Sequence, residues 1–210
     1  MKPWLCDILA CPIDKYYPLE LTIFSYETIE DEFKKILIVY EKKDFNQIQA
    51  ENIIEIQREN GTIYLKDDIL IEKSPIKEYL NGIKSSIEEV EHIYDKSPFE
   101  LSKKCFDIIR KDIKTKIASF TNYDDFEELK NILPELYFLN KVKTEIEIET
   151  GLLFCAQCKR WYPIIETIPQ MLPDEYRNEK KEIEFLKTNK DLLDSTFFNQ
   201  NLKPYNLQSS

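Results

Sequence analysis

Four side chains that can bind a metal ion lie in two matching groups near opposite ends of the sequence, and this arrangement constrains the fold more than any other feature. Cys155-Ala-Gln-Cys158 places two thiolates about one tight turn apart, so that both can reach the same tetrahedral ion. Cys11 and Asp14 have the same spacing near the start of the chain. If one ion binds all four, the two ends of the chain meet at that ion and the residues between them form an insertion.

Cys155 and Cys158 have two other interpretations, a redox pair and two small buried residues. A thioredoxin-like motif is followed by a helix, whereas Trp161 to Ile165 has the pattern of a strand. Zinc is therefore the better interpretation. Asp14 is the weakest of the four ligands, since structural zinc sites prefer sulfur and imidazole. Cys6 is the alternative fourth ligand, although its place on the apolar side of a short predicted helix favours the core.

Charge and cysteine content exclude several classes of protein. The 210 residues carry a net charge of −10, which argues against independent binding to a phosphate backbone. The longest apolar runs fall far short of the roughly 20 residues that span a bilayer, so no membrane partner is expected. Five cysteines without a recognisable secretory signal predict a reducing compartment, and we expect a cytoplasmic protein.

Hydrophobic periodicity predicts a mixture of strands and helices. Strands are expected at Tyr17–Phe24, Lys35–Tyr40, Lys143–Glu149 and Trp161–Ile165, with a hairpin around Asn60-Gly61. Helices are expected at Pro3–Ala10, Pro75–Ile93, Pro98–Ile117, Tyr123–Phe138 with a kink at Pro134, and within Tyr176–Leu193; a loose tail is expected after Asp194.

No catalytic residue stands out. His92 belongs to no triad pattern and Cys105 falls at helical spacing among apolar residues, so both are assigned to structure. Only Gly61, Gly82 and Gly151 are available for a glycine-rich phosphate loop, and no strand-to-helix turn carries one. We therefore expect no catalysis and no S-adenosylmethionine site in this chain.

Two blocks of sequence resemble a known family. The first is Trp4-Leu-Cys-Asp-Ile-Leu-Ala-Cys-Pro-Ile-Asp-Lys15 with Pro18-Leu-Glu-Leu21, and the second is Gly151-Leu-Leu-Phe-Cys-Ala-Gln-Cys158 with Trp161-Tyr-Pro-Ile164 and Ile168-Pro-Gln-Met-Leu-Pro173. In this order, at opposite ends of a chain, they resemble the zinc-binding methyltransferase activators called the tRNA-methyltransferase subunit one-twelve family, of the archaeal and eukaryotic type.

The chain departs from the family at three places. Lys159 and Thr167 stand where members usually carry glycine. Asp14 replaces the second cysteine of a Cys-Pro-x-Cys motif, a variation seen in the family. The insertion from about Ser25 to Lys143 is far longer than in the short relatives.

The resemblance implies a fold and a function. The fold is α+β, with a small zinc-ribbon-like β domain built from residues 1–24 and 144–178, an inserted domain of strands and helices at 25–143, and a C-terminal helix with a flexible tail at 179–210. The function is that of a non-catalytic subunit that stabilises and activates class I S-adenosylmethionine-dependent methyltransferases acting on tRNA, ribosomal RNA or translation release factors. S-adenosylmethionine binds only the partner, and a heterodimer is expected.

The partner is expected to dock on a strand-like segment that has more apolar residues than one face of a small domain needs. Its candidate contacts are Trp161, Ile164, Ile165, Ile168, Met171 and Leu172. Two alternatives remain at this stage: a zinc-ribbon nucleic-acid-binding factor, for which only Lys159-Arg160 and scattered lysines argue, and an enzyme of thiol exchange.

Overall fold

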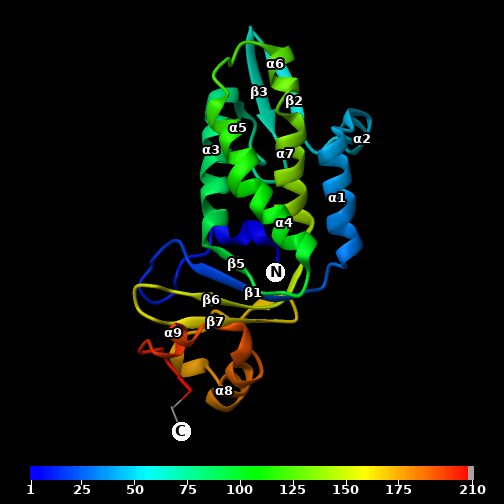
Figure 1. Cartoon of the computed structure of the whole chain (residues 1–210). Helices are drawn as coiled ribbons and strands as arrows, with labels where there is room; N and C mark the ends of the chain where they lie inside the picture. Colours follow the sequence, from blue (N-terminus) through cyan, green and yellow to red (C-terminus); the bar gives the residue numbers. More distant parts are fainter. Residues whose placement is uncertain (208–210) are drawn as a thin grey trace.

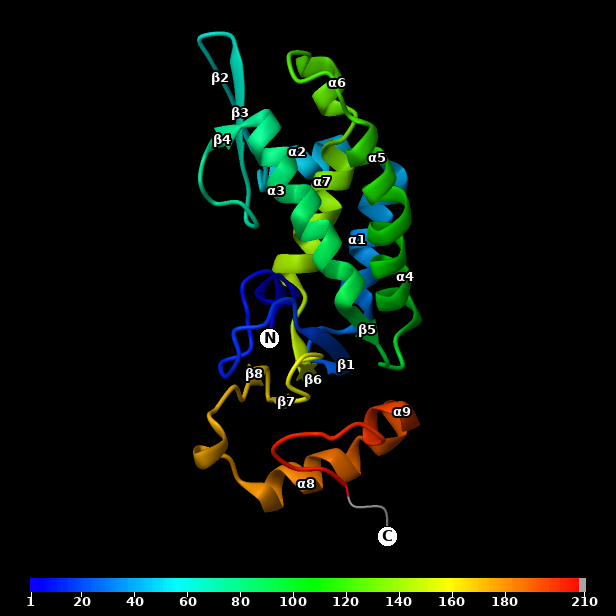
Figure 2. The ribbon, with the colours of Figure 1, turned by 90° about the vertical axis from the view of Figure 1, so that its left-hand side faces the viewer.

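The chain folds in three layers. In the computed structural model, which describes residues 1–207, a five-stranded sheet lies between a layer of helices and the C-terminal segment, residues 174–207 (Figure 1). A view turned by 90° shows the same order, with the helices extending away from one face of the sheet and α8 and α9 on the other (Figure 2). The predicted α+β class is confirmed.

Strands from the beginning, the middle and the end of the chain make up the main sheet, in the order β5-β1-β6-β7-β8. Strands β1 and β5 are parallel and the other neighbours are antiparallel. The bounds are β1 (Glu20–Tyr26), β5 (Ile93–Asp95), β6 (Ile148–Phe154), β7 (Trp161–Ile165) and β8 (Ile168–Pro169). Gly151 is required in β6, because a Cβ at this position would lie 2.7 Å from the Thr22 carbonyl oxygen.

Both faces of this sheet are apolar, which explains why the second half of β6 and all of β7 read as continuous apolar runs. Successive side chains of a strand point to opposite faces. Leu21, Ile23, Leu153, Tyr162 and Ile164 belong to the core shared with the helices. Phe24, Leu152, Phe154 and Trp161 form a second cluster with Phe185, Leu186 and Leu202 of the C-terminal segment.

The helical layer is built from residues between β1 and β6. Its helices are α1 (Glu30–Lys42), α2 (Phe45–Glu51), α3 (Ile76–Glu89), α4 (Glu100–Ile108), α5 (Lys114–Ser119), α6 (Phe126–Lys130) and α7 (Leu133–Asn140). A π-helical stretch, Ile109–Ile113, joins α4 to α5, and another, Lys141–Glu145, follows α7. A small second sheet of β2 (Glu55–Glu59), β3 (Thr62–Lys66) and β4 (Ser74–Pro75) packs on α3.

Several predicted elements are confirmed. The Asn60-Gly61 hairpin joins β2 to β3, and both residues have positive φ, 49° and 85°. The helix predicted after Ser74-Pro75 is α3, and the predicted strand Trp161–Ile165 is β7. Pro134 lies in the first turn of α7, where a missing amide hydrogen does no harm, so the helix predicted at Tyr123–Phe138 is two helices rather than one kinked helix.

Two predicted strands are wrong. Lys35–Tyr40 belongs to helix α1, where Phe33, Ile36, Leu37 and Tyr40 face the core at helical spacing. At Lys143–Glu149 the strand begins only at Ile148, and Lys143 lies in the π-helical stretch. Lys143 is buried there, and its ammonium group donates to the Ser86 carbonyl at 2.8 Å.

The C-terminal segment contains α8 (Glu179–Thr188) and α9 (Ser195–Phe198). Residues 195–207, for which composition predicts a loose tail, pack against the sheet, because Phe197, Leu202 and Leu207 cover its second apolar face. Residues 208–210 of that predicted tail lie outside the described residues. The predicted domain boundaries stay a prediction. Among the described residues, no helix is both long and apolar enough to cross a bilayer.

Candidate metal centre

The four predicted ligands come together on the helix-facing side of the main sheet. One ligand atom from each of Cys11, Asp14, Cys155 and Cys158 lies within 4.8 Å of the others. Cys11 and Cys155 are buried, whereas Asp14 and Cys158 are partly exposed. The two ends of the chain therefore meet at one point, as the paired spacing predicts.

The distances in this cluster fit a tetrahedral zinc ion. Two sulfurs each about 2.3 Å from such an ion are about 3.8 Å apart, and a sulfur and a carboxylate oxygen are about 3.5 Å apart. The Cys11 and Cys158 sulfurs are separated by 3.7 Å. The Cys155 sulfur lies 3.6 Å from both carboxylate oxygens of Asp14. Donor type and spacing thus both suit zinc, which these four residues would hold.

The ligands sit on two turns with the same backbone hydrogen bonds, which we call the N-terminal knuckle (residues 11–16) and the C-terminal knuckle (residues 155–160). In the first, the Lys15 amide donates to the Cys11 carbonyl at 2.9 Å and the Cys11 amide donates to the Tyr16 carbonyl at 2.9 Å. The corresponding bonds of the second are Lys159 to Cys155 at 2.9 Å and Cys155 to Arg160 at 2.8 Å.

The residue after the second ligand has a left-handed backbone conformation in both knuckles. Lys15 has φ 62° and Lys159 has φ 63°, a conformation that favours glycine. Thr167, the other position where the family usually carries glycine, has φ 67° in the tight turn between β7 and β8. The chain thus keeps these turns without glycine and accepts the backbone strain.

The electrostatics of the cluster fit metal-dependent thiolates. Burial raises the pKa of the Cys155 thiol to about 12 and also raises the pKa of Cys11. Both thiols are therefore protonated at neutral pH without metal, and zinc binding releases their protons. Burial acts to raise the pKa of Asp14, but hydrogen bonds, first from Cys11 and then from the Tyr16 amide, lower it overall, so Asp14 is ready to bind as a carboxylate.

Sequence reasoning missed Tyr162 and Arg160 at this site. The Tyr162 hydroxyl lies 3.3 Å from the Cys11 sulfur, and burial raises the tyrosine pKa, which keeps the hydroxyl a neutral donor. Arg160 forms a bidentate ion pair with Asp174 beside the C-terminal knuckle. The alternation along β7 points Tyr162 to the helix-facing side, but no local signal pairs it with a cysteine near the start of the chain.

The other cysteines lie apart from the four ligands. Cys6 is buried, and burial raises its pKa to about 12. Its thiol is not among the four grouped donors, so Asp14 rather than Cys6 lies with the three thiols of the group. Cys105 is fully buried in the core, as its helical spacing predicts.

The six predicted partner contacts differ in their exposure. Trp161 and Ile164 are fully buried by this chain itself, the first under the C-terminal segment and the second under the helices. Met171 is partly buried against the main core. Three residues near β8 remain on the surface, with exposed fractions of 41% for Ile165, 59% for Ile168 and 43% for Leu172.

Comparison with known proteins identifies the family of this chain. A model of the family described as Trm112p-like protein matches residues 2–166. The match includes both knuckles and the whole helical layer, and it ends before the C-terminal segment. A search of the curated proteins gave no match.

Proposed function

Because the chain belongs to the Trm112p-like family, we propose that it is a non-catalytic subunit that stabilises and activates a class I S-adenosylmethionine-dependent methyltransferase. Family membership carries this proposal, since the match extends over both knuckles and the helical layer. The family implies a methyltransferase-activator role in general. The catalytic residues and the S-adenosylmethionine then belong to the partner, which acts on tRNA, ribosomal RNA or a translation release factor in the cytoplasm.

Zinc has a structural role in this proposal. Held by Cys11, Asp14, Cys155 and Cys158, it would join the two ends of the chain and fix the sheet edge formed by β7 and β8. A closed set of four protein ligands leaves no position for a substrate or a water, so the ion supplies cross-linking and no reaction chemistry.

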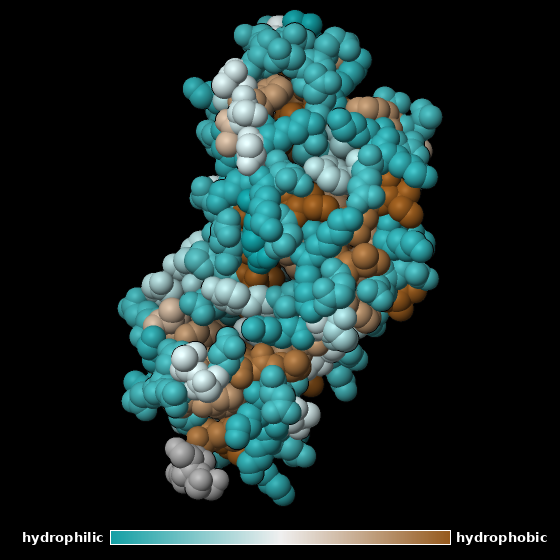
Figure 3. Space-filling model, in the orientation of Figure 1, coloured by the Kyte–Doolittle hydropathy of each residue, from teal (hydrophilic) through white to brown (hydrophobic). Residues whose placement is uncertain are grey.

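The docking surface we propose is the β8 edge, defined by Ile165, Ile168 and Leu172. These are exposed apolar side chains close together in sequence at the end of a sheet, where a partner strand or loop can pair with the backbone. Most of the face seen in Figure 3 has hydrophobic surface only in separate patches among hydrophilic side chains. The predicted contacts Trp161 and Ile164 support this edge from inside rather than touching the partner.

Co-expression tests the proposed function. Each class I methyltransferase of the source cell is produced with and without this chain, and its solubility and its transfer of labelled methyl groups from S-adenosylmethionine are measured. We expect at least one methyltransferase to form a stable complex and to gain both. If all of them are equally soluble and active alone, or if the purified chain itself transfers methyl groups, the activator role is refuted.

A charge at the β8 edge tests the docking surface. We expect Ile168→Asp to weaken binding to the co-expressed methyltransferase by about 30-fold or more, the effect of losing a hot-spot contact, while the melting temperature of the chain stays unchanged. The matched control is Ile71→Asp, since Ile71 is 76% exposed in the connection between β3 and β4. Full binding by Ile168→Asp would place the docking surface elsewhere.

A further inference from the structure

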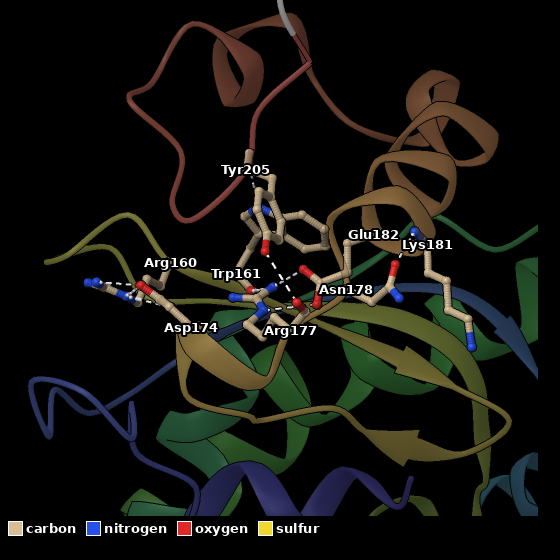
Figure 4. Close-up of polar contacts among 8 residues, drawn as sticks. All are labelled: Arg160, Trp161, Asp174, Arg177, Asn178, Lys181, Glu182 and Tyr205. Atoms are coloured by element: carbon tan, nitrogen blue, oxygen red, sulfur yellow. Dashed lines mark hydrogen bonds and ion pairs between the residues drawn. The ribbon is translucent and has the colours of Figure 1, made fainter.

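Two chains of contacts connect the neighbourhood of the metal ligands to the C-terminal segment, which lies outside the family match. The first begins at Arg160, two residues after Cys158. Its guanidinium group donates to Asp174 from Nε at 3.1 Å and from Nη2 at 2.8 Å, so the side chain is held in one orientation (Figure 4). Arg160 is two residues from the ligand Cys158, so this ion pair ties the C-terminal knuckle to the C-terminal segment.

The second chain of contacts begins at Tyr162, whose hydroxyl lies 3.3 Å from the Cys11 sulfur. The guanidinium carbon of Arg177 is 5.2 Å from the centre of the Tyr162 ring. Arg177 donates from Nη2 to the Trp161 carbonyl at 2.7 Å and from Nε to the Glu182 carboxylate at 2.9 Å (Figure 4). Arg177 is buried, so its contact with the Tyr162 ring is part of the packed interior.

Both contacts can compensate the negative charge of the metal ligands. Three thiolates and one carboxylate around a divalent ion leave a net charge of about −2 in a partly buried place, which is costly without compensation. A fixed cation and a neutral hydroxyl donor lower that cost, and groups that orient or neutralise metal ligands tune metal affinity. Arg160 supplies the cation and Tyr162 the hydroxyl donor.

The C-terminal segment is firmly attached at this place. The Lys203 amide donates to the Lys159 carbonyl at 2.9 Å, and the Trp161 indole donates to the Tyr205 carbonyl at 3.0 Å (Figure 4). The Trp161 ring also stacks on Phe185 of α8, with ring centres 6.2 Å apart. These contacts reach residues 159–161, which directly follow the ligand Cys158.

We propose that the C-terminal segment supports the metal centre: Asp174 fixes Arg160, two residues after the ligand Cys158, and Arg177 fixes Tyr162 beside Cys11. The segment thereby raises the affinity of the chain for zinc. This inference does not depend on which partner the chain serves.

The test measures zinc binding by the full chain, with zinc alone as the probe and a chelator as competitor. We expect Arg160→Gln to weaken zinc binding by about 10-fold or more, the usual effect of losing an outer contact of a metal ligand. Asp174→Asn should weaken it by several-fold, because Arg160 keeps its charge but loses its fixed orientation. Arg160→Lys, which keeps the charge, should fall between wild type and Arg160→Gln. Tyr162→Phe tests the second chain of contacts in the same way.

Matched controls come from α4, where Lys103 and Glu100 form an exposed ion pair at 2.7 Å. Lys103→Gln and Glu100→Gln make the same charge changes and should leave zinc affinity within about twofold of wild type. Cobalt replaces zinc for a second measurement: in Arg160→Gln the thiolate-to-cobalt absorption band should move to longer wavelength, because the sulfur loses a neighbouring positive charge.

A third measurement separates positioning from folding. Arg160 and Asp174 are partly exposed, so urea unfolding of the metal-free variants should match that of the metal-free wild type. The proposal is overturned if Arg160→Gln and Asp174→Asn bind zinc within twofold of wild type. It is also overturned if their metal-free forms lose as much stability as their zinc-bound forms. Because no methyltransferase takes part, either result leaves the proposed function to its own test.

Discussion

The two knuckles have the same backbone conformation but differ in their second ligand and in what packs behind them. Each closes with the same pair of amide-to-carbonyl hydrogen bonds, and in each a lysine with positive φ, Lys15 or Lys159, follows the second ligand. The N-terminal knuckle offers Cys11 and the weaker ligand Asp14. The C-terminal knuckle offers Cys155 and Cys158 and has the C-terminal segment behind it. From this difference we expect the turn geometry to set the position of the ion, and the ligands and their surroundings to set how tightly it binds.

Removing a thiolate from either knuckle should have the largest effect. We expect Cys11→Ser and Cys155→Ser to weaken zinc binding by more than about 100-fold each, beyond the usual effect of an outer contact, because a hydroxyl is a poor zinc ligand. Metal analysis after purification without chelator measures the loss, and the melting temperature in zinc should fall with it.

Cys6→Ala is the control for these two variants, since it removes a buried cysteine outside the group of four and should keep one zinc per chain. Stoichiometric zinc in Cys155→Ser with an unchanged melting temperature would mean that the Cys155 thiolate is not needed to hold the ion.

Giving both knuckles two cysteines should have a smaller effect, and it should raise zinc affinity rather than lower it. Asp14→Cys completes a set of four sulfur ligands, which zinc prefers, and we expect zinc affinity to rise by about 10-fold. Competition with a chelator measures it. Asp124→Cys adds a thiol at an exposed position away from the site and should change nothing. Weaker binding by Asp14→Cys would show that the hydrogen bond from the Tyr16 amide to Asp14, at 3.1 Å, matters more than ligand type.

The smallest effect, on the free energy of unfolding, should come from replacing the two lysines with positive φ. Lys15→Gly and Lys159→Gly relieve strain but give the unfolded chain more freedom and lose a side-chain contact, so each should stabilise the zinc-bound chain by about 0.5 kcal/mol. Urea unfolding measures both. Lys34→Gly, inside helix α1, should instead cost about 1 kcal/mol. A loss in only one knuckle would mean that the two turns are not equivalent.

The metal ligands could be predicted from sequence because each knuckle is a local pattern. Cys155-x-x-Cys158 and Cys11-x-x-Asp14 have the spacing that one ion needs, and the structure groups these four residues. The groups around the ligands could not be predicted in the same way. Tyr162 reaches Cys11 only through the fold, and Asp174 reaches Arg160 across a loop that no periodicity describes.

The strands and helices, too, could be predicted where a local pattern decides them and not where distant packing does. The Asn60-Gly61 hairpin was predictable because its turn requires positive φ at both residues. The strand predicted at Lys35–Tyr40 is wrong because Ile36, Ile38 and Val39 are β-branched residues, which favour strands. Packing within the helical layer imposes a helix instead. The exposed or buried state of Trp161 also depended on a segment far along the chain, the one that covers it.

The order of the strands has a consequence for synthesis on the ribosome. Strand β1 emerges early, but its antiparallel partner β6 is made only after the whole helical insertion. At about 5 to 20 residues per second, β1 waits roughly 6 to 26 s for that partner. During this time the apolar side chains of β1 can meet only β5, which arrives midway, and the helices that fold locally. The nascent chain must therefore carry an unfinished sheet until residues 148–165 have left the ribosome.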